Sequence, residues 1–170
     1  MPPVGNNTHT SGDLLQAVFD GDPGVVKAAL DAGASVNGHS EQSYAPIVAA
    51  TLTGDVDMVE FLLEQGADPE NPLNITMAPG MPGTRPLQIA IGSGHVKIAH
   101  LLLEAGADPV SENKIGYTHL HGVALSGHVD VVDMLHSKAP STLNRCASQG
   151  ETPLFVACCN GHESVVSKLL

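Results

Sequence analysis

Residues 86–108 read PLQIAIGSGHVKIAHLLLEAGAD, and this stretch decides the fold. It opens with a proline, which the first turn of a helix tolerates because the missing N–H would have no partner there, and the run GSG at 92–94 ends that short helix. From His95 to Ala105 the apolar residues recur at spacings of three and four, which is typical of an amphipathic helix. Gly106 then ends the second helix. The stretch therefore predicts two short helices joined by a tight turn.

The same unit is copied along the chain. A Gly-Asp or Gly-His pair recurs with its glycine at positions 21, 54, 94, 127 and 161, at intervals of 33, 40, 33 and 34 residues. Isolated helices below about 12 to 15 residues rarely persist in water, so each helix pair has to bury its apolar stripe against the next pair. The small residues that let neighbouring helices approach are Ala17, Ala50, Ala90, Ala124 and Ala157. We therefore predict an all-α solenoid.

These copies resemble the ankyrin-repeat family, whose pattern runs Gly-x-Thr-Pro-Leu-His-x-Ala-Ala-x-x-Gly-His and then Val-x-x-Leu-Leu-x-x-Gly-Ala-Asp. The nearest matches are GETPLFVA at 150–157 and LLLEAGAD at 101–108. The resemblance implies stacked helix-turn-helix repeats with short β-hairpin loops, about five repeats with the last truncated. We expect a disordered or extended segment over residues 1–11 and a repeat domain over 12–170. The repeats fall at about 12–40, 41–82, 83–115, 116–149 and, incompletely, 150–170.

Three departures from the pattern stand out. The second and third copies are separated by seven extra residues within 71–83, either a binding loop or a tolerated flexible insertion. The fourth copy ends in Lys138-Ala139-Pro140 instead of Gly-Ala-Asp, which leaves its exit turn open. The chain stops at Leu170, inside the second helix of the fifth copy, so we expect it to be a fragment of a larger protein.

The resemblance implies partner binding on a concave face formed by the hairpin tips and the first helix of each repeat. The register of the repeats places on this face the residues just before each Gly-His or Gly-Asp pair and those just before each first helix. The candidates are Phe19, Asp20, Gln42, Tyr44, Leu52, Thr53, Met81, Thr84, Ile115, Tyr117, Leu125, Ser126, Gln149 and Glu151, and the register also passes through Gly92, Ser93, Cys159 and Asn160.

Five of these candidates suit anchors for a protein partner, because they are apolar or amphipathic where solvent exposure is expected. They are Tyr44, Leu52, Ile115, Tyr117 and Leu125. The alternative is a scatter of exposed apolar residues of the kind that any protein surface carries.

The formal net charge of −11 disfavours nucleic acid and anionic membrane surfaces as partners. Residues 1–80 carry eleven acidic residues against Lys27 alone. This field predicts a protein partner with a basic surface, which acidic groups such as Asp20, Asp55 and Asp57 would attract. The alternative is a solvated face that keeps an apolar repeat protein soluble.

Catalytic and metal-binding motifs are missing from the sequence. It has no phosphate-binding loop, dinucleotide fingerprint or nucleophile elbow, so we predict that the chain is not an enzyme and needs no cofactor. His119, His121 and the three cysteines do not have zinc-ligand spacing, so we predict no metal site. The resemblance gives the histidines of the Gly-His pairs, His95, His128 and His162, a structural role in loop hydrogen bonding.

The cysteines and the apolar runs of the sequence indicate the cellular location of the chain and its relation to membranes. An odd cysteine count and a start without a signal peptide predict a cytoplasmic or nuclear location. No apolar run approaches the roughly 20 residues of a membrane-spanning helix, so we expect no membrane insertion. We also expect a monomer.

Three further interpretations stay open at the level of sequence. Tyr44 and Tyr117 favour a minor alternative, a reader of a modified peptide of the methyl-lysine type, although such recognition uses a cage of several rings. The domain could also target or regulate a catalytic domain that follows it in a larger protein. Asn37 resembles the asparagine that some ankyrin repeats offer for hydroxylation.

Overall fold

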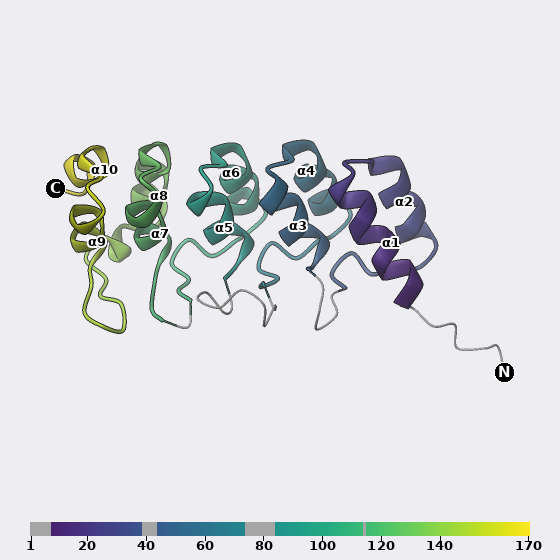
Figure 1. The fold of residues 1–170 in the computed structure, drawn as a ribbon, viewed down its shortest axis with the longest axis horizontal. Helices are drawn as coiled ribbons and strands as arrows, with labels where there is room; N and C mark the ends of the chain where they lie inside the picture. The colour runs from purple at the N-terminus through teal and green to yellow at the C-terminus, as the bar shows by residue number, and fades with distance from the viewer. Residues whose placement is uncertain (1–7, 39–43, 74–83, 114) are drawn as a thin grey trace.

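The computed structural model describes residues 8–38, 44–73, 84–113 and 115–170. In these ranges the helices form two layers, which Figure 1 shows as two rows. The first helices of the repeats are α1 (Thr8–Phe19), α3 (Pro46–Thr53), α5 (Pro86–Gly92), α7 (His119–Ser126) and α9 (Pro153–Cys159). The second helices are α2 (Pro23–Asp31), α4 (Val56–Glu64), α6 (Val96–Glu104), α8 (Val132–Lys138) and α10 (Glu163–Leu169).

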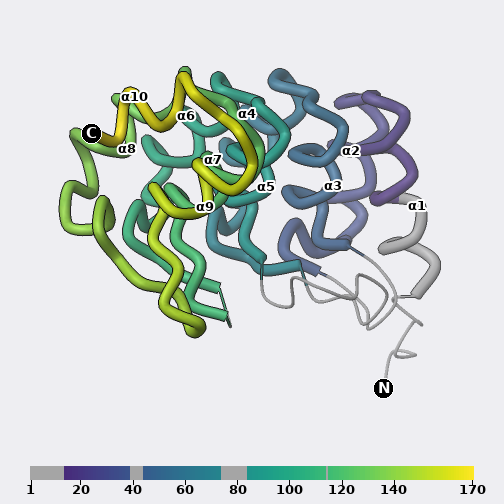
Figure 2. The backbone as a smooth tube through the Cα atoms, turned by 60° about the vertical axis from the view of Figure 1, so that its left-hand side comes forward, coloured from purple at the N-terminus to yellow at the C-terminus, as the bar shows by residue number. Residues whose placement is uncertain are grey.

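The repeats stack one on the next. Each first helix contacts its own second helix, and the first helices contact one another in an unbroken row from α1 to α9. In the second layer α4 contacts α6 and α8 contacts α10. Figure 2 shows the same succession from another side. The predicted all-α solenoid is confirmed.

The helix ends follow from single residues. Pro46, Pro86 and Pro153 each occupy the first turn of a first helix, where proline costs no hydrogen bond. Asp22 and Asp55 cap the second helices α2 and α4 by accepting hydrogen bonds from free N–H groups of the first turn. These local signals fix where these five helices begin.

The core runs along the whole stack between the two layers. Of the five alanines predicted to let helices approach, Ala50, Ala90, Ala124 and Ala157 are fully buried, with 0% of their surface exposed, and Ala17 is nearly so. Because the core is continuous across the repeat boundaries, every repeat depends on its neighbour for burial.

The structure differs from the sequence-based expectations at the start of the first helix and in the hairpin loops, and it shows the exit turn of the fourth repeat, which the sequence leaves open. Helix α1 begins at Thr8, so residues 8–11 are helical rather than part of an extended or disordered segment. The fourth repeat leaves α8 through a short 3₁₀ turn, η2 (Pro140–Thr142), because its exit carries no glycine. No strand forms in the described ranges, where the predicted hairpin loops show one antiparallel bridge, between Glu112 and Thr118.

Residues 74–83, the larger part of the insertion, lie outside the described residues. A second 3₁₀ turn, η1 (Val129–Val131), precedes α8. Within the described part of the chain, no helix combines the length and apolar character needed to cross a bilayer.

Candidate binding groove

The repeats are joined by a contact that uses the recurring glycines. The glycine of each Gly-Asp or Gly-His pair has a positive φ, between 67° and 78°, which residues with a side chain rarely adopt. In the first four pairs the Cα faces the Asp or His of the next repeat, and a Cβ on Gly94 would lie only 2.6 Å from the imidazole of His128. The same relation holds between Gly54 and His95 and between Gly127 and His162.

The histidines of the Gly-His pairs therefore pack between successive repeats. His162 also makes the loop hydrogen bond that the resemblance implied, since its Nε2 lies 3.0 Å from the carbonyl oxygen of Leu125.

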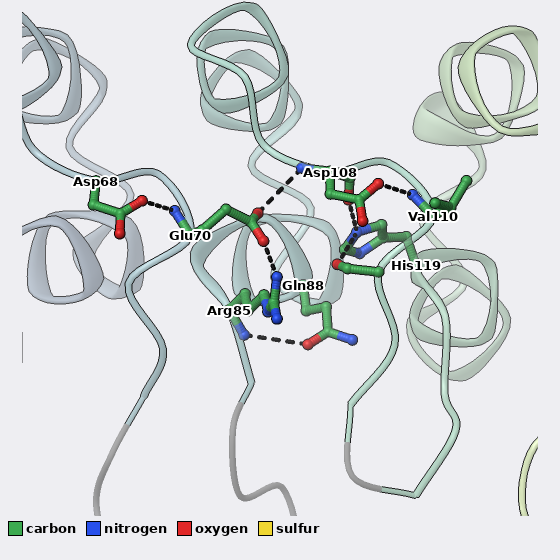
Figure 3. Close-up of polar contacts among 8 residues, drawn as sticks. Asp68, Glu70, Arg85, Gln88, Asp108, Val110 and His119 are labelled. Carbon is green, nitrogen blue, oxygen red and sulfur yellow. Dashed lines mark hydrogen bonds and ion pairs between the residues drawn. The ribbon is translucent and has the colours of Figure 1, made fainter.

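A second set of contacts joins the loops that follow the second helices. Asn37 accepts a hydrogen bond at Oδ1 from the Asp68 N–H (2.7 Å) and donates one from Nδ2 to the Gly66 carbonyl (3.2 Å). Glu70 holds the equivalent position one repeat later and accepts from the Asp108 N–H at 3.2 Å. Its other carboxylate oxygen forms an ion pair with Arg85, and Figure 3 shows Glu70 between these two partners.

Asn37 thus holds two repeats together through its side-chain amide. Its hydroxylation stays a prediction.

His119 occupies the position where α3, α5 and α9 carry proline. It is buried, and its Nε2 lies 3.0 Å from the Asp108 carbonyl oxygen and 3.2 Å from Ser111 Oγ (Figure 3). Among the described residues its Nδ1 has no hydrogen-bond partner. Burial lowers the pKa of His119 to about 4, so the ring is neutral at pH 7.

A hollow of about 260 Å³ opens where the loops before α5 and α7 meet these two helices. Its lining residues are Thr84, Gln88, Gly92, Asn113, Tyr117, Thr118, Gly122, Leu125 and Ser126. Because loops form one wall and first helices the other, the hollow lies in the groove between them. We call the surface made by these loops and the first helices the groove face.

Two glycines create this hollow. Gly92 stands two residues before the glycine of its Gly-His pair, at the position that Leu52 holds one repeat earlier and Leu125 one repeat later. Gly122 stands five residues before the equivalent glycine, where the two preceding repeats have Ala49 and Ile89. The neighbouring helices α5 and α7 therefore each lack a side chain where they line the hollow.

A comparison with protein-family models matches ankyrin repeats (3 copies) to residues 14–113 and 109–170. The chain belongs to the ankyrin-repeat family. Ankyrin repeats are generally protein–protein interaction modules, and they are typically not enzymes. The question is then which residues of this ankyrin-repeat chain are placed to contact a partner.

The apolar candidates fall into two groups. Phe19, Leu52, Ile115 and Leu125 are exposed, at 43%, 41%, 41% and 37% of their surface. Tyr44 and Tyr117 are half-buried instead. The solvent exposure expected of Tyr44 and Tyr117 is therefore only partial.

Each tyrosine ring packs within the protein. The rings of Phe19 and Tyr44 meet edge to face, with centroids 6.2 Å apart, and the ring of Tyr117 stacks on His121 at 4.9 Å. Burial, with a smaller contribution from the Glu151 carboxylate, raises the pKa of Tyr117. The Tyr117 hydroxyl therefore stays protonated at neutral pH.

The polar candidates differ in their exposure to solvent. Asp20, Thr53 and Gln149 are exposed, Ser126 and Glu151 are half-buried, and Thr84 is buried. Gln42 and Met81 lie outside the described residues. The hollow brings together Thr84, Tyr117, Leu125 and Ser126 from the candidate set, while Phe19, Leu52 and the rest lie elsewhere on the stack.

Sequence reasoning missed four residues that line the hollow, namely Gln88, Asn113, Thr118 and Gly122. Gln88 and Gly122 lie one helical turn before Gly92 and Ser126, which the register does include. A rule that extended the register back by four residues along each first helix would have found both. In the described part of this ankyrin domain, no group of three His, Cys, Asp or Glu side chains is placed to hold a metal ion.

Proposed function

We propose that this chain is a protein-binding module that holds a segment of a partner protein on the groove face. One observation carries the proposal. Leu52 and Leu125 share one register position on the first helices and both expose apolar surface there, and Gly92, at the same position between them, opens the hollow. Exposed apolar groups aligned beside a hollow are a better binding surface than the same groups scattered over a protein.

The charge of the chain supports a partner with a basic surface. Phe19, Leu52 and Leu125 hold the same register position and form an exposed apolar row. Asp20, next to Phe19 at the start of this row, is exposed. Asp57 on α4 is exposed as well. Such a field speeds the encounter with a basic partner more than it adds to final affinity. The acidic N-terminal half is therefore proposed to steer the partner, and the apolar row to hold it.

The positions of the two tyrosines favour the alternative function, a reader of methyl-lysine, less than the binding of an unmodified segment. Tyr44 precedes α3 and Tyr117 precedes α7, and the α5 repeat lies between them. Each ring is already in contact with a neighbour of its own, Phe19 or His121. A cage for a methylammonium group needs several rings around one point, so the groove is proposed to bind an unmodified segment. A monomeric state, a cytoplasmic or nuclear location, and a targeting or regulatory role within a larger protein are proposed alongside it.

The test compares proteins captured from a lysate of the source cells by the purified chain and by a Leu52→Arg/Leu125→Arg variant. Two buried charges at a partner interface are costly, so the affinity for a captured partner is expected to fall by at least about tenfold. Val25→Arg is the matched control, because Val25 is 50% exposed but lies on α2, in the other helix layer.

The control variant is expected to capture the same partners as the wild type. If the double variant captures them with unchanged affinity, the groove face is not the binding surface.

A further inference from the structure

We propose that the hollow between Gly92 and Gly122 receives one large apolar side chain, such as Leu, Met or Phe, from an extended partner segment that also carries a Lys or Arg beside it. This inference rests on the proposed function and specifies the partner of the same groove face. It is carried by the two glycines, the size of the hollow, an unused hydroxyl on its wall and a nearby unpaired carboxylate.

Neither glycine is required by the backbone or by crowding. Gly92 and Gly122 are not among the described glycines with a positive φ. A Cβ on Gly92 would have no atom within 4 Å, and one on Gly122 would only touch Ile91 Cγ2 at 3.8 Å, an ordinary contact. Glycine in the middle of a helix, as at Gly122, costs about 0.5–1 kcal/mol relative to alanine, and Gly92, the last residue of α5, carries a smaller cost of the same kind. The chain therefore carries a stability cost at two adjacent places with no internal reason for it, and its structural result is the hollow.

The size of the hollow fits one side chain. Its volume of about 260 Å³ falls below the range of roughly 300–1,000 Å³ that is usual for pockets that enclose a whole small molecule. The register supports an apolar occupant, because the leucines on either side, Leu52 and Leu125, show what the missing side chain at Gly92 would have been. An apolar side chain from a partner would complete that row.

The wall of the hollow also offers a hydrogen-bonding group. Ser126 Oγ is buried and has no hydrogen-bond partner within the described ranges. Buried hydroxyl groups are normally paired, so an unpaired one beside a hollow is suited to the backbone of a bound segment. An extended segment presents such backbone groups on both sides of its side chain.

Glu151 is the residue that favours a Lys or Arg in the partner segment. Its Oε2 has no hydrogen-bond partner among the described residues, and none of the ion pairs formed there includes it. Its backbone carbonyl lies 3.0 Å from Nε2 of His121, on which the Tyr117 ring stacks. The Glu151 side chain does not line the hollow and its Oε2 is buried, but its charge acts on Tyr117, whose pKa it helps to raise. The carboxylate therefore favours a Lys or Arg of the partner segment at the Tyr117 wall of the hollow.

The test uses capped Gly/Ser peptides of equal length as probes. The central pair of each peptide is Leu-Lys, Ser-Lys, Leu-Glu or Leu-Ser. Binding is followed through the backbone amide signals of the ¹⁵N-labelled chain. Leu-Lys peptides are expected to bind most tightly and to shift the signals of Gly92, Gly122 and Leu125. If Ser-Lys binds as well as Leu-Lys, or if no peptide shifts these signals, the apolar occupant is refuted. If Leu-Glu binds as well as Leu-Lys, the basic residue is refuted.

A filled hollow provides the second measurement. Gly92→Leu restores the side chain of the neighbouring repeats, and the affinity for the Leu-Lys peptide is expected to fall by about tenfold or more because the anchor is excluded. Cys159→Leu is the control, since Cys159 is exposed at the same register position but does not line the hollow. Its effect is expected to stay below about twofold.

Unchanged peptide affinity in Gly92→Leu would overturn the inference. The proposed function would be untouched by that result, because it depends on partner capture through Leu52 and Leu125. Loss of capture in Gly92→Leu as well as in the Leu52→Arg/Leu125→Arg variant would support both.

Discussion

Gln88 in α5 and His121 in α7 make the same pair of hydrogen bonds. Each accepts one from the backbone N–H three residues earlier, to Gln88 Oε1 at 3.2 Å and to His121 Nδ1 at 3.1 Å. Each then reaches a loop carbonyl of the next repeat: Gln88 Nε2 donates to Tyr117 O at 3.1 Å, and His121 Nε2 lies 3.0 Å from Glu151 O. Because the backbone N–H donates to Nδ1, the proton of the neutral His121 ring is on Nε2. A glutamine thus replaces the histidine of the ankyrin pattern without loss of either bond.

This equivalence predicts how substitutions at Gln88 behave. Gln88→Ala leaves one N–H and one carbonyl without their partner, and the free energy of unfolding is expected to fall by about 1–3 kcal/mol. Gln88→His is expected to recover most of that loss. Urea denaturation followed by circular dichroism measures both, with Gln149→Ala at an exposed position as the control. A histidine variant as unstable as the alanine variant would show that the two residues are not equivalent.

The glycine of a Gly-His pair is predicted to be irreplaceable for two separable reasons. Gly94→Ala would force a residue with a side chain into a φ of 73°, and its Cβ would lie 2.6 Å from the ring of His128. The first effect costs about 1–2 kcal/mol, and the clash adds a cost of its own. The melting temperature and the free energy of unfolding measure the total.

Gly106→Ala is the matched control, because Gly106 has a φ of 99° but a Cβ there would meet nothing within 4 Å. It is expected to show the backbone cost alone and to destabilise less than Gly94→Ala. Adding His128→Ala to Gly94→Ala should recover the difference. Equal losses in the two single variants would contradict the contact between Gly94 and His128.

The repeat architecture could be predicted from the sequence because its signals are local. Proline at the start of a first helix, glycine at its end and apolar residues every three or four positions each restrict the backbone within a few residues. Because five copies follow in register, each repeat can bury its apolar stripe by stacking against the next one. The fourth exit turn could not be predicted, because without a glycine the sequence carries no signal for the turn that follows α8.

The candidate site was predicted less well, because register fixes where a Cα lies but not where its side chain turns. Tyr117 lines the hollow, yet its ring stacks on His121 and is half-buried, which its register position does not reveal. The hollow depends on Gly92 and Gly122 together, and these lie in different repeats. Their adjacency becomes visible only when the helices are stacked.

The stability of the domain is predicted to depend on pH through His119. The pKa of about 4 in the folded chain lies below the ordinary value of 6.5 in the unfolded chain, so the unfolded state binds the proton more tightly. The contribution is fully present above pH 6.5, falls as the pH drops from there towards 4, and levels off below. The loss is on the order of 3 kcal/mol. Urea denaturation at a series of pH values measures it.

His119→Pro is the comparison for the pH series, since Pro86 and Pro153 hold the same position in other repeats. The variant is expected to lose less stability between pH 6.5 and 4 than the wild type. Burial also lowers the pKa of His121, so part of the pH dependence is expected to remain. Parallel curves for the two proteins would show that His119 is not the group that titrates.

Gly92 and Gly122 give the opposite prediction to Gly94. Gly92→Ala and Gly122→Ala add a methyl group where nothing clashes and where φ is not positive. Gly122→Ala, inside α7, is expected to raise the free energy of unfolding by about 0.5–1 kcal/mol, and Gly92→Ala, at the end of α5, to raise it by less. Thermal and urea denaturation measure the gain. Sites that bind ligands commonly retain residues that are not optimal for stability. A variant that is more stable but binds partners less tightly would therefore show that the glycines serve binding. A loss of stability in either variant would instead mean that the glycine serves the fold.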